Sequence, residues 1–412
     1  MPLVYTKTMY VAILGRQPAI SMAELEHLYG ADDVQWFSDD TALVDADTLV
    51  LDHVGGTLKA GRVVLEFSKA NWGEVNTKII QNYTSQWAEA QGKLTLGLSS
   101  YGFSVSARDV QKIGILLKQR LKKAGVSLRI VPNDAPALST AASHHNKLGL
   151  SPNKLELIIV RGKNGRVVVA ESIGAQNITQ LARRDQQRPK RDAFVGMLPP
   201  KLAQIIVNLA VGNADPKYGG KLLDPFCGTG VILQEAMLRG FDVYGSDISE
   251  KMVDYTDQNL MWLLNQPYSP VSAAPKDRSD PNWQYFHLEQ GDATSHRWAF
   301  SPQFVAAEAY LGQPFSAPPS PAKLAEVRGN CNHILTRFLQ NIGTQIQPGT
   351  SLCIAVPAWR DKAGNFTHLP LINQLEKLGY HRHAFTHVTN DDLLYYRPNQ
   401  VVGRELLVLT KA

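Results

Sequence analysis

The chain has 412 residues, with 42 lysines and arginines against 37 aspartates and glutamates. This length accommodates two or three domains, and the absence of any apolar run of about 18 residues excludes a membrane-spanning helix. The three cysteines, Cys227, Cys331 and Cys353, are far apart, and the start of the chain lacks the features of a secretory signal. We therefore expect a cytoplasmic protein with reduced thiols, without a disulfide framework or a metal site.

The charge is distributed unevenly along the chain. Residues 1–70 carry 5 basic and 10 acidic side chains, residues 71–195 carry 19 and 8, and residues 196–412 carry 18 and 19. The positive excess is therefore confined to the middle third. A basic segment beside a nearly neutral one is typical of a module that binds a polyanion and delivers it to a separate catalytic domain. A solvated basic face without a partner is the alternative.

Residues 1–70 are predicted to form a small α+β module of the ferredoxin-like kind. We expect a strand at 10–14, a helix at 21–29 and further strands at 41–44 and 62–67. Ser21 and Glu24 have the spacing of a capping box at the start of that helix. Nothing in this segment indicates chemistry, so a structural or docking role is expected.

Residues 71–175 show a second alternation of helices and strands. Helices are expected at 77–91 and 109–123, and strands at 93–98, 128–131, 155–160 and 166–172. The second helix is amphipathic, because apolar residues recur on one face while basic residues occupy the others. Basic side chains spread in this way contact phosphates and do not read bases. The candidates for nucleic-acid binding are Arg108, Lys112, Lys118, Lys122 and Lys123.

Residues 176–195 are predicted to be an extended basic linker, because Pro189 interrupts any helix. The linker is expected to line the path between the basic module and the following domain; a flexible tether is the alternative. Its candidate contacts are Arg183, Arg184, Arg188, Lys190 and Arg191.

The stretch from Leu222 to Val231 is the most informative in the chain. An apolar strand ends at Asp224, and a turn with Gly228 and Gly230 leads into a helix, so a ligand can approach the bare backbone. A second apolar strand ends at Asp247, where an acid is placed to bind the two hydroxyls of a ribose. A dinucleotide fingerprint requires a third glycine where this chain has Leu233, and Asp224 would repel a pyrophosphate. A carboxylate at this position suits an ammonium or sulfonium ligand.

Residues 196–412 continue the alternation of an α/β domain. Helices are expected at 201–210, 231–239, 249–264, 322–340 and 369–378, and further strands at 283–288, 304–307, 351–357, 381–388 and 404–410. Parallel strands crossed by helices, with a hairpin at the end, indicate a doubly wound, mostly parallel sheet.

Asp224-Pro225-Phe226-Cys227-Gly228-Thr229-Gly230 resembles motif I of the S-adenosylmethionine-dependent methyltransferases. Residues 184–204 and the start of the chain, 14–25, are similar to the tRNA guanosine-10 N2-methyltransferases of archaea and eukaryotes. The resemblance implies a Rossmann-like class I methyltransferase domain at 196–412, with a seven-stranded sheet, preceded by a THUMP-like RNA-binding domain at 71–175. It also implies S-adenosylmethionine as cofactor, tRNA as partner and transfer to N2 of a guanosine.

The resemblance assigns the cofactor site residue by residue. Asp247 is expected to hold the ribose hydroxyls and Asp292 the adenine amino group, with the amide of Ala293 near the ring. The remaining cofactor-binding candidates are Asp224, Phe226, Cys227, Gly228, Thr229, Gly230 and Ile248. Cys227 is expected to be a small filler of the motif and not a nucleophile.

One motif departs from the family pattern. The family has Asp-Pro-Pro-Tyr after its fourth strand, whereas this chain has Ala307-Glu308-Ala309-Tyr310. Ala307 cannot accept a hydrogen bond from the target amino group. Glu308 is a candidate substitute, although neighbouring strand residues point to opposite faces. Tyr310 matches the pattern and can stack on a flipped base, so Glu308 and Tyr310 are the catalytic candidates.

Two other functions stay open. A DNA amino-methyltransferase would need a target-recognition insert, and none is visible. A catalytically degenerate homologue that binds RNA without transferring a methyl group is suggested by the altered motif alone. We expect a monomer, and the sequence leaves open whether a small activator subunit is required.

Overall fold

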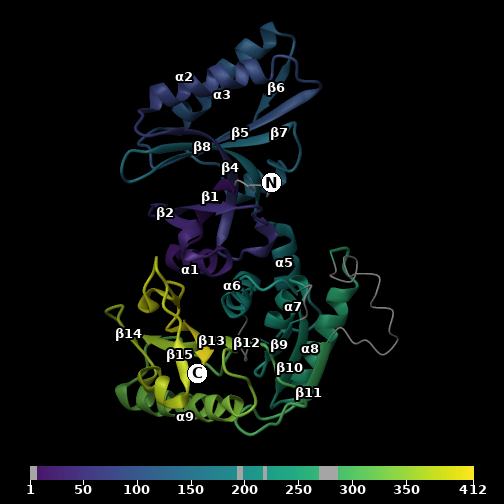
Figure 1. Cartoon of the computed structure of the whole chain (residues 1–412), viewed down its shortest axis with the longest axis vertical. Helices are drawn as coiled ribbons and strands as arrows, with labels where there is room; N and C mark the ends of the chain where they lie inside the picture. Colours follow the sequence, from purple (N-terminus) through teal and green to yellow (C-terminus); the bar gives the residue numbers. More distant parts are fainter. Residues whose placement is uncertain (1–6, 193–197, 217–219, 269–285) are drawn as a thin grey trace, which may run out of the picture. The chain divides into compact units, whose positions relative to one another are not determined.

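The computed structural model describes residues 7–192, 198–216, 220–268 and 286–412. The chain divides into two compact units, residues 1–180 and residues 181–412. Each unit is built around one large sheet (Figure 1). None of the described helices is both long and apolar enough to cross a membrane.

The N-terminal unit contains an eight-stranded sheet in the order β2-β3-β1-β4-β8-β7-β5-β6. The strands are β1 (Thr8–Leu14), β2 (Val34–Ser38), β3 (Thr41–Ala46), β4 (Thr57–Phe67), β5 (Lys93–Tyr101), β6 (Ser127–Ile130), β7 (Lys154–Arg161) and β8 (Val167–Ala175). Strand β4 pairs with β1 on one side and with β8 on the other. One continuous sheet therefore joins the segments 1–70 and 71–175.

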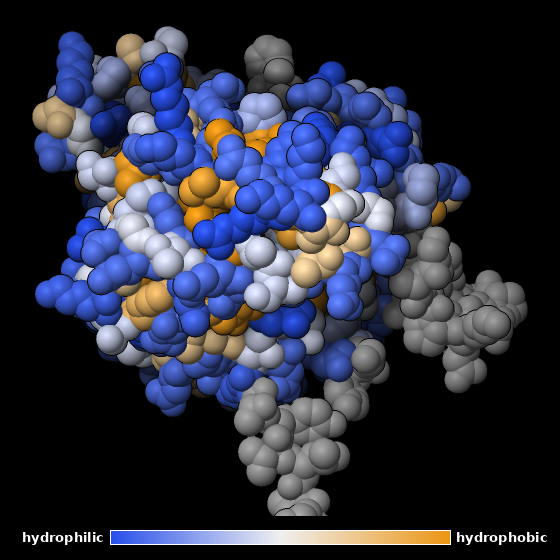
Figure 2. Space-filling model, turned by 90° about the horizontal axis from the view of Figure 1, so that it is seen from above, coloured by the Kyte–Doolittle hydropathy of each residue, from blue (hydrophilic) through white to orange (hydrophobic). Residues whose placement is uncertain are grey.

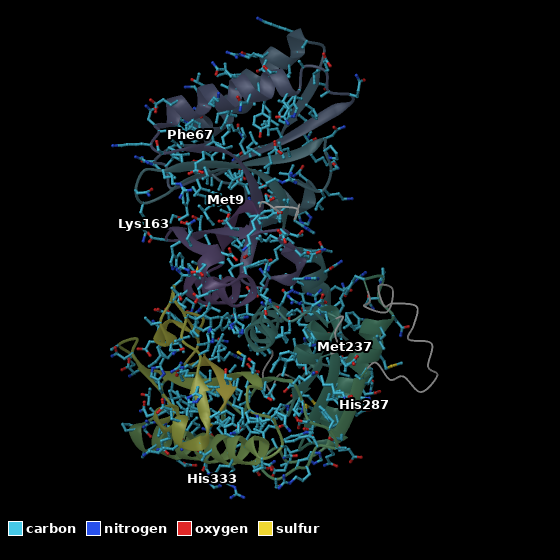
Figure 3. The ribbon with its side chains drawn as sticks, viewed as in Figure 1. Met9, Phe67, Lys163, Met237, His287 and His333 are labelled. Carbon is cyan, nitrogen blue, oxygen red and sulfur yellow. The ribbon has the colours of Figure 1, made fainter. Side chains whose placement is uncertain are left out.

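Four α-helices of the N-terminal unit are α1 (Pro18–Tyr29), α2 (Trp72–Gln86), α3 (Ala107–Lys123) and α4 (Thr140–His145). Helices α2 and α3 lie side by side over the sheet and share an apolar core with β5, β7 and β8 (Figure 1). Phe67, labelled in Figure 3, packs against this core from β4. Ser106 and Asp109 form a capping box that fixes the start of α3.

The C-terminal unit contains a sheet in the order β11-β10-β9-β12-β13-β17-β15, with β14 paired to β13 and β16 to β17. The strands are β9 (Lys221–Asp224), β10 (Asp242–Asp247), β11 (Phe286–Gln290), β12 (Phe304–Glu308), β13 (Ser351–Arg360), β14 (Phe366–Thr367), β15 (Tyr380–Arg382), β16 (Leu394–Tyr395) and β17 (Val402–Lys411). Strands β9 to β13 are parallel, and β17 runs antiparallel to β13.

The helices of this unit are α6 (Pro200–Val211), α7 (Val231–Leu238), α8 (Glu250–Leu264) and α9 (Pro321–Gly343). Helix α9 covers one face of the sheet through an apolar core that includes Phe338, Leu352 and Leu407. The chain leaves β9 for β10 on one side and later returns to β12 on the other side. This reversal of strand order opens a crevice at the carboxyl ends of β9 and β12, where ligands bind in such sheets.

Several expected elements differ in the structure. The helix expected at 21–29 begins at Pro18, and the Ser21 hydroxyl donates to the Gly56 carbonyl instead of capping the helix. The helix expected at 369–378 consists of two 3-10 turns, Pro370–Gln374 and Glu376–Leu378. The strand expected at 381–388 is confined to Tyr380–Arg382. Part of the strand expected at 283–288 lies outside the described residues.

The linker is the largest correction. Residues expected to be extended form helix α5 (Ile178–Gln186), which ends before Pro189. Its amphipathic pattern buries Leu181 and Arg184. Pro189 prevents the helix from continuing past it, but residues several positions before it keep their backbone hydrogen bonds. A helix can therefore form on the N-terminal side of the proline.

Candidate active site

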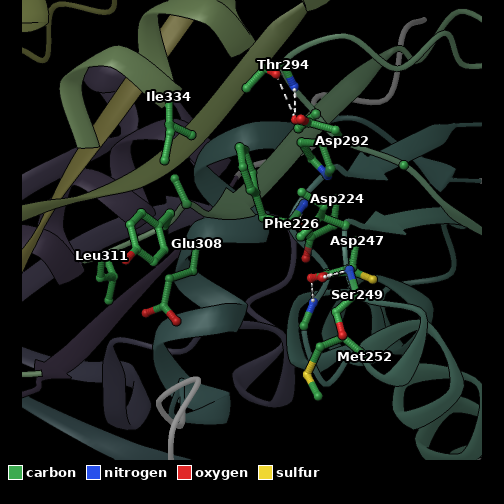
Figure 4. A pocket seen from close by; sticks show the side chains of 18 of the residues that line it. Asp224, Phe226, Asp247, Ser249, Met252, Asp292, Thr294, Glu308, Leu311 and Ile334 are labelled. Atoms are coloured by element: carbon green, nitrogen blue, oxygen red, sulfur yellow. Dashed lines mark hydrogen bonds between the residues drawn. The ribbon is translucent and has the colours of Figure 1, made fainter. Parts of the chain in front are cut away.

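A pocket of about 1170 Å³ opens at the carboxyl ends of β9, β10 and β12. The loops after β9, β10, β11 and β12 each contribute residues, and α9 contributes a further wall. Figure 4 shows Glu308 and Leu311 on one side of the pocket and Asp292 and Thr294 on the other. The pocket therefore lies at the reversal of strand order that the topology predicts for a ligand site.

The loop after β9 has a left-handed backbone conformation at its two glycines. Gly228 and Gly230 have φ values of 52° and 77°, which side-chain-bearing residues rarely adopt. A Cβ on Gly230 would lie 2.8 Å from Cγ2 of Thr256, so the loop also needs the missing side chain. The Thr256 hydroxyl donates to the Gly228 carbonyl at 2.8 Å and fixes the loop to α8.

Asp247 ties the loop after β10 to the loop after β9. Its Oδ2 accepts the Gly228 N–H at 3.0 Å, and its Oδ1 accepts the Ser249 N–H at 2.9 Å. Burial raises the pKa of the Asp247 carboxyl, and the two N–H donors oppose this shift. The next residue, Ile248, lines the pocket with 68% of its surface exposed. An exposed apolar side chain beside a carboxylate suits the flat ring and hydroxyls of a nucleoside.

Asp224 is the most deeply buried acid of the pocket. Only 1% of its surface is exposed, and its Oδ1 accepts the Phe226 N–H at 3.1 Å. Burial raises its pKa well above the ordinary value, an effect that the nearby charges of Asp247 and Glu308 reinforce. A cationic ligand would lower the cost of ionising this carboxyl.

Asp292 and Ala293 lie where the sequence places them, in the loop after β11. Both line the pocket, together with Phe226, Cys227 and Thr229 from the loop after β9. Asp292 Oδ1 accepts the backbone N–H and the hydroxyl of Thr294. Every cofactor candidate except Gly230 is therefore part of the lining, and Gly230 shapes the turn beside it.

Glu308 also lines the pocket, from the end of β12. Val305 belongs to the core beneath α9, so Ala307, two residues later, points to that face and Glu308 to the opposite one. The Glu308 carboxylate accepts a hydrogen bond from Nε of Arg404 on β17. Tyr310 lines the pocket with 48% of its surface exposed.

Several lining residues were not expected from the sequence. Helix α9 presents one face at helical spacing, with Asn330, His333, Ile334 and Arg337; Figure 3 labels His333 on this helix. The spacing of three and four residues was visible in the sequence, but nothing there showed that this polar face meets a pocket. Asp192, Leu198, Ser249, Lys251 and Met252 are further lining residues that were not expected.

The linker candidates divide into two groups. Arg184 and Arg188 are buried, and Arg184 forms an ion pair with the buried Glu235 on α7. Arg188 Nη1 donates to the Arg184 carbonyl, and both guanidinium groups are largely shielded from solvent. Arg183, Lys190 and Arg191 keep more exposed side chains. Both backbone polar groups of Lys190 bond to the Asn259 amide, which holds this part of the linker on α8.

The basic residues of α3 lie in the N-terminal unit. Lys112, Lys118, Lys122 and Lys123 are exposed, and Arg108 lies near the start of the helix. Figure 2 looks onto the side that carries α2 and α3, where hydrophilic side chains surround small apolar patches. Ile115 and Leu116 on α3 are among the exposed apolar residues.

The cysteines do not supply a nucleophile. All three are free and buried. Burial raises the pKa of the Cys227 thiol well above its ordinary value, and the carboxylates of Asp224 and Asp247 add to the shift. A thiol in this environment is neutral and unreactive. The described residues contain no cluster of His, Cys, Asp and Glu that could hold a metal ion.

The loop after β9 lies within a segment that matches a known family. Residues 188–263 match the family model described as "RMKL-like, methyltransferase domain". The matched segment is therefore similar to that methyltransferase family. It contains Asp224, the two glycines of the loop, Asp247 and Ile248.

Curated relatives match a short part of the chain. A "tRNA (guanine(10)-N2)-dimethyltransferase" of Methanothermobacter thermautotrophicus is 47% identical over 78 residues, which cover 18% of this chain and 22% of the relative. A protein of the same name from Pyrococcus abyssi is 46% identical over 71 residues, which cover 17% of this chain and 20% of the relative. The chain thus matches about a fifth of each relative's length.

A solved structure extends the likeness to both units. The crystal structure of TrmN from Thermus thermophilus has a TM-score of 0.50 and 15% sequence identity, over 98% of this chain and 100% of that chain. This likeness shows a shared fold. The expected fold class is confirmed, with a doubly wound, mostly parallel sheet in the C-terminal unit.

Proposed function

We propose that the protein is an S-adenosylmethionine-dependent tRNA methyltransferase that modifies N2 of a guanosine. The observation that carries the proposal is the Asp224–Gly230 loop, which lines the pocket and lies in the segment that matches the methyltransferase family model. The named relatives that match part of the chain are tRNA (guanine(10)-N2)-dimethyltransferases. The loop supplies buried carboxylates and a glycine turn, the features that a cationic nucleoside cofactor requires.

The residues fit this cofactor. Asp247 and the exposed Ile248 would hold the ribose and the adenine ring, and Asp292 would hold the adenine amino group. Asp224 would compensate the positive charge. When bound, S-adenosylmethionine supplies the methyl group: its C–S bond breaks with the electron pair kept by sulfur, and an N–C bond forms.

Glu308 and Tyr310 would receive the target base. Tyr310 presents an aromatic face on which a flipped base can stack, a contact worth about 1–3 kcal/mol. The Glu308 carboxylate would accept a hydrogen bond from the exocyclic amino group and orient its lone pair. Because the amino proton becomes acidic as the nitrogen turns tetrahedral, orientation and electrostatic stabilisation carry most of the effect.

The N-terminal unit would bind the RNA. In this proposal the exposed lysines of α3 contact phosphates, within a THUMP-like domain at 71–175 that follows a module at 1–70. Arg183, Lys190 and Arg191 of the segment 176–195 extend these contacts, whereas Arg184 and Arg188 stabilise the domain at 196–412. The enzyme would act in the cytoplasm, in keeping with its free thiols. It would act as a monomer or with a small activator subunit.

Transfer of a radioactive methyl group from S-adenosylmethionine into bulk tRNA tests the proposal. We expect incorporation that depends on Asp247 and on Tyr310, with or without a partner subunit. If the parent protein transfers no methyl group to any tRNA, a catalytically inactive RNA-binding homologue is the better description. Methylation of DNA in place of tRNA would support the DNA amino-methyltransferase alternative.

A further inference from the structure

Glu308 is bound to a residue from the last strand of the chain. Arg404 Nε donates to Glu308 Oε1, and the two side chains are 9% and 15% exposed. Arg404 lies on β17, 96 residues away in the sequence. Among the described residues, no group bonds the second carboxylate oxygen, Oε2, so this oxygen remains for a ligand.

The sheet register explains how these side chains meet. Glu308 is paired with Ala355 on β13, and Ala355 is paired with Leu406 on β17. Paired residues share a face, and Arg404, two residues from Leu406, shares it too. Glu308 and Arg404 therefore lie on one face with β13 between them.

The length of both side chains matters for this contact. Strands β12 and β17 are two strand spacings apart, roughly 9–10 Å. Two long side chains can span this distance over the small, buried Ala355. An aspartate at 308 would be shorter by one methylene group and would not reach Arg404.

We propose that Arg404 is a positioning residue for the methyl transfer, which fixes Glu308 so that Oε2 accepts an N–H of the exocyclic amino group of guanine. This inference rests on the proposed function. A carboxylate has acceptors only, so this site selects a base edge that donates and rejects one that presents a carbonyl. Arg404 neutralises the charge of Glu308 and removes its rotational freedom, and Glu308 contacts the base.

The test compares binding of two tRNAs that differ by one amino group. The tRNAs carry guanosine or inosine at the nucleotide that the parent methylates, or at position 10 if it methylates none. Binding is measured with S-adenosylhomocysteine present, so no turnover is needed. Base-pairing differences between the two RNAs cancel when each variant's affinity ratio is compared with that of the parent.

In Arg404→Met and in Glu308→Gln we expect the preference for guanosine over inosine to fall about 10- to 100-fold relative to the parent, the effect of losing a hydrogen bond to a charged group. Glu308→Asp should lose most of the preference although it keeps the charge. In the double variant Arg404→Met, Glu308→Gln, the preference for guanosine should be no lower than in either single variant. In turnover, Arg404→Met should lower kcat/KM for guanosine tRNA by a comparable factor.

Arg382→Met is the matched control. Arg382 pairs with the buried Glu405, which neighbours Arg404 on β17 but is not part of the pocket lining. This variant should lose stability and keep the parent's preference. The inference is overturned if Arg404→Met keeps the parent's preference, or if Arg382→Met loses as much. A preference that depends on Arg404 without any methyl transfer would retain the role of Arg404 in recognising the base and reject the proposed function.

Discussion

Asp224 has an unusual environment for a residue at the edge of a ligand pocket, because only 1% of its surface is exposed. Its pKa in the folded protein is raised by burial above the ordinary value of 3.8. For a raised pKa, the contribution to stability is present below the unfolded value and is lost as the pH rises through the folded value. The raised pKa of Asp224 therefore lowers the stability of the unliganded protein at neutral pH, and a cationic ligand reverses this effect.

Replacing Asp224 with asparagine should separate stability from binding. Asp224→Asn keeps an oxygen for the Phe226 N–H but cannot ionise. We expect the free energy of unfolding of the unliganded protein to increase by about 1–2 kcal/mol at neutral pH, with a smaller gain at acidic pH. Cofactor affinity should decrease and lose much of its pH dependence. Urea unfolding and calorimetry at several pH values measure both, and an unchanged profile would refute the role given to Asp224.

Asp247→Ala should weaken S-adenosylmethionine binding roughly 10- to 150-fold, because it removes a charge-assisted hydrogen bond worth about 1.5–3 kcal/mol. It also releases the Gly228 and Ser249 N–H groups that position the loops. Asp254→Ala, at a position on α8 that bonds Gln258 and does not line the pocket, is the control. Equal calorimetric affinities for parent and Asp247→Ala would reject the assignment.

At this scale, the residues that the sequence assigned to the cofactor do lie around one pocket. Asp224, Asp247 and Asp292 follow consecutive strands, so local order was enough to bring them together. Arg404 could not be predicted, because its contact with Glu308 depends on the register of three strands. Nor could the sequence show that Arg184 and Arg188 turn inward, since a basic run looks the same whether exposed or buried.

Helix α5 shows how an element expected to be a tether becomes part of a domain. Arg184 Nε and Nη2 donate to the two carboxylate oxygens of Glu235 on α7, and the side chains are 7% and 1% exposed. Asn259 on α8 bonds both Lys190 and the Thr229 carbonyl in the loop after β9. The segment 184–190 is therefore packed against the same helices that support the pocket.

Arg184→Ala should destabilise the C-terminal unit by about 3–5 kcal/mol, because it leaves Glu235 buried without its partner. The neighbouring Arg183→Ala is the control, since Arg183 is more exposed and donates to the exposed Gln187, and its effect should stay within about 0.5 kcal/mol. Urea unfolding measures both changes. Equal effects of the two changes would contradict the structural role of Arg184.

The elements themselves were predicted where periodicity was clear. Helices α3, α6, α8 and α9 lie within a few residues of their expected limits, because each has a regular apolar stripe. The prediction for residues 369–388 was wrong because short apolar runs are compatible with helix, strand and turn alike. The joining of residues 1–70 to 71–175 in one sheet depends on β4 pairing with β8, which no local signal reveals.

For the whole molecule, we expect RNA binding and cofactor binding to be separable. Neutralising Lys118, Lys122 and Lys123 together should reduce tRNA affinity and lower its salt dependence by about one unit of slope for each phosphate that is no longer neutralised. Cofactor affinity should remain at the parent value, because these residues lie in the N-terminal unit and the pocket lining lies in the other.

The control neutralises Lys323, Lys362 and Lys377, which belong to the C-terminal unit and do not line the pocket. This variant carries the same change in net charge, so it separates a local interaction from a general electrostatic effect. Salt titrations of tRNA binding provide the comparison. Identical slopes for the two triple variants would show that α3 does not face the RNA.

Mass spectrometry of nucleosides tests the central claim most directly. Unmodified tRNA is incubated with the protein and S-adenosylmethionine, digested to nucleosides and compared with tRNA treated with Asp247→Ala. The proposed function predicts guanosine methylated at N2, once or twice, in the parent sample and much less in the variant sample. Methylation of adenosine or cytidine, or tRNA without any added methyl group, would contradict it.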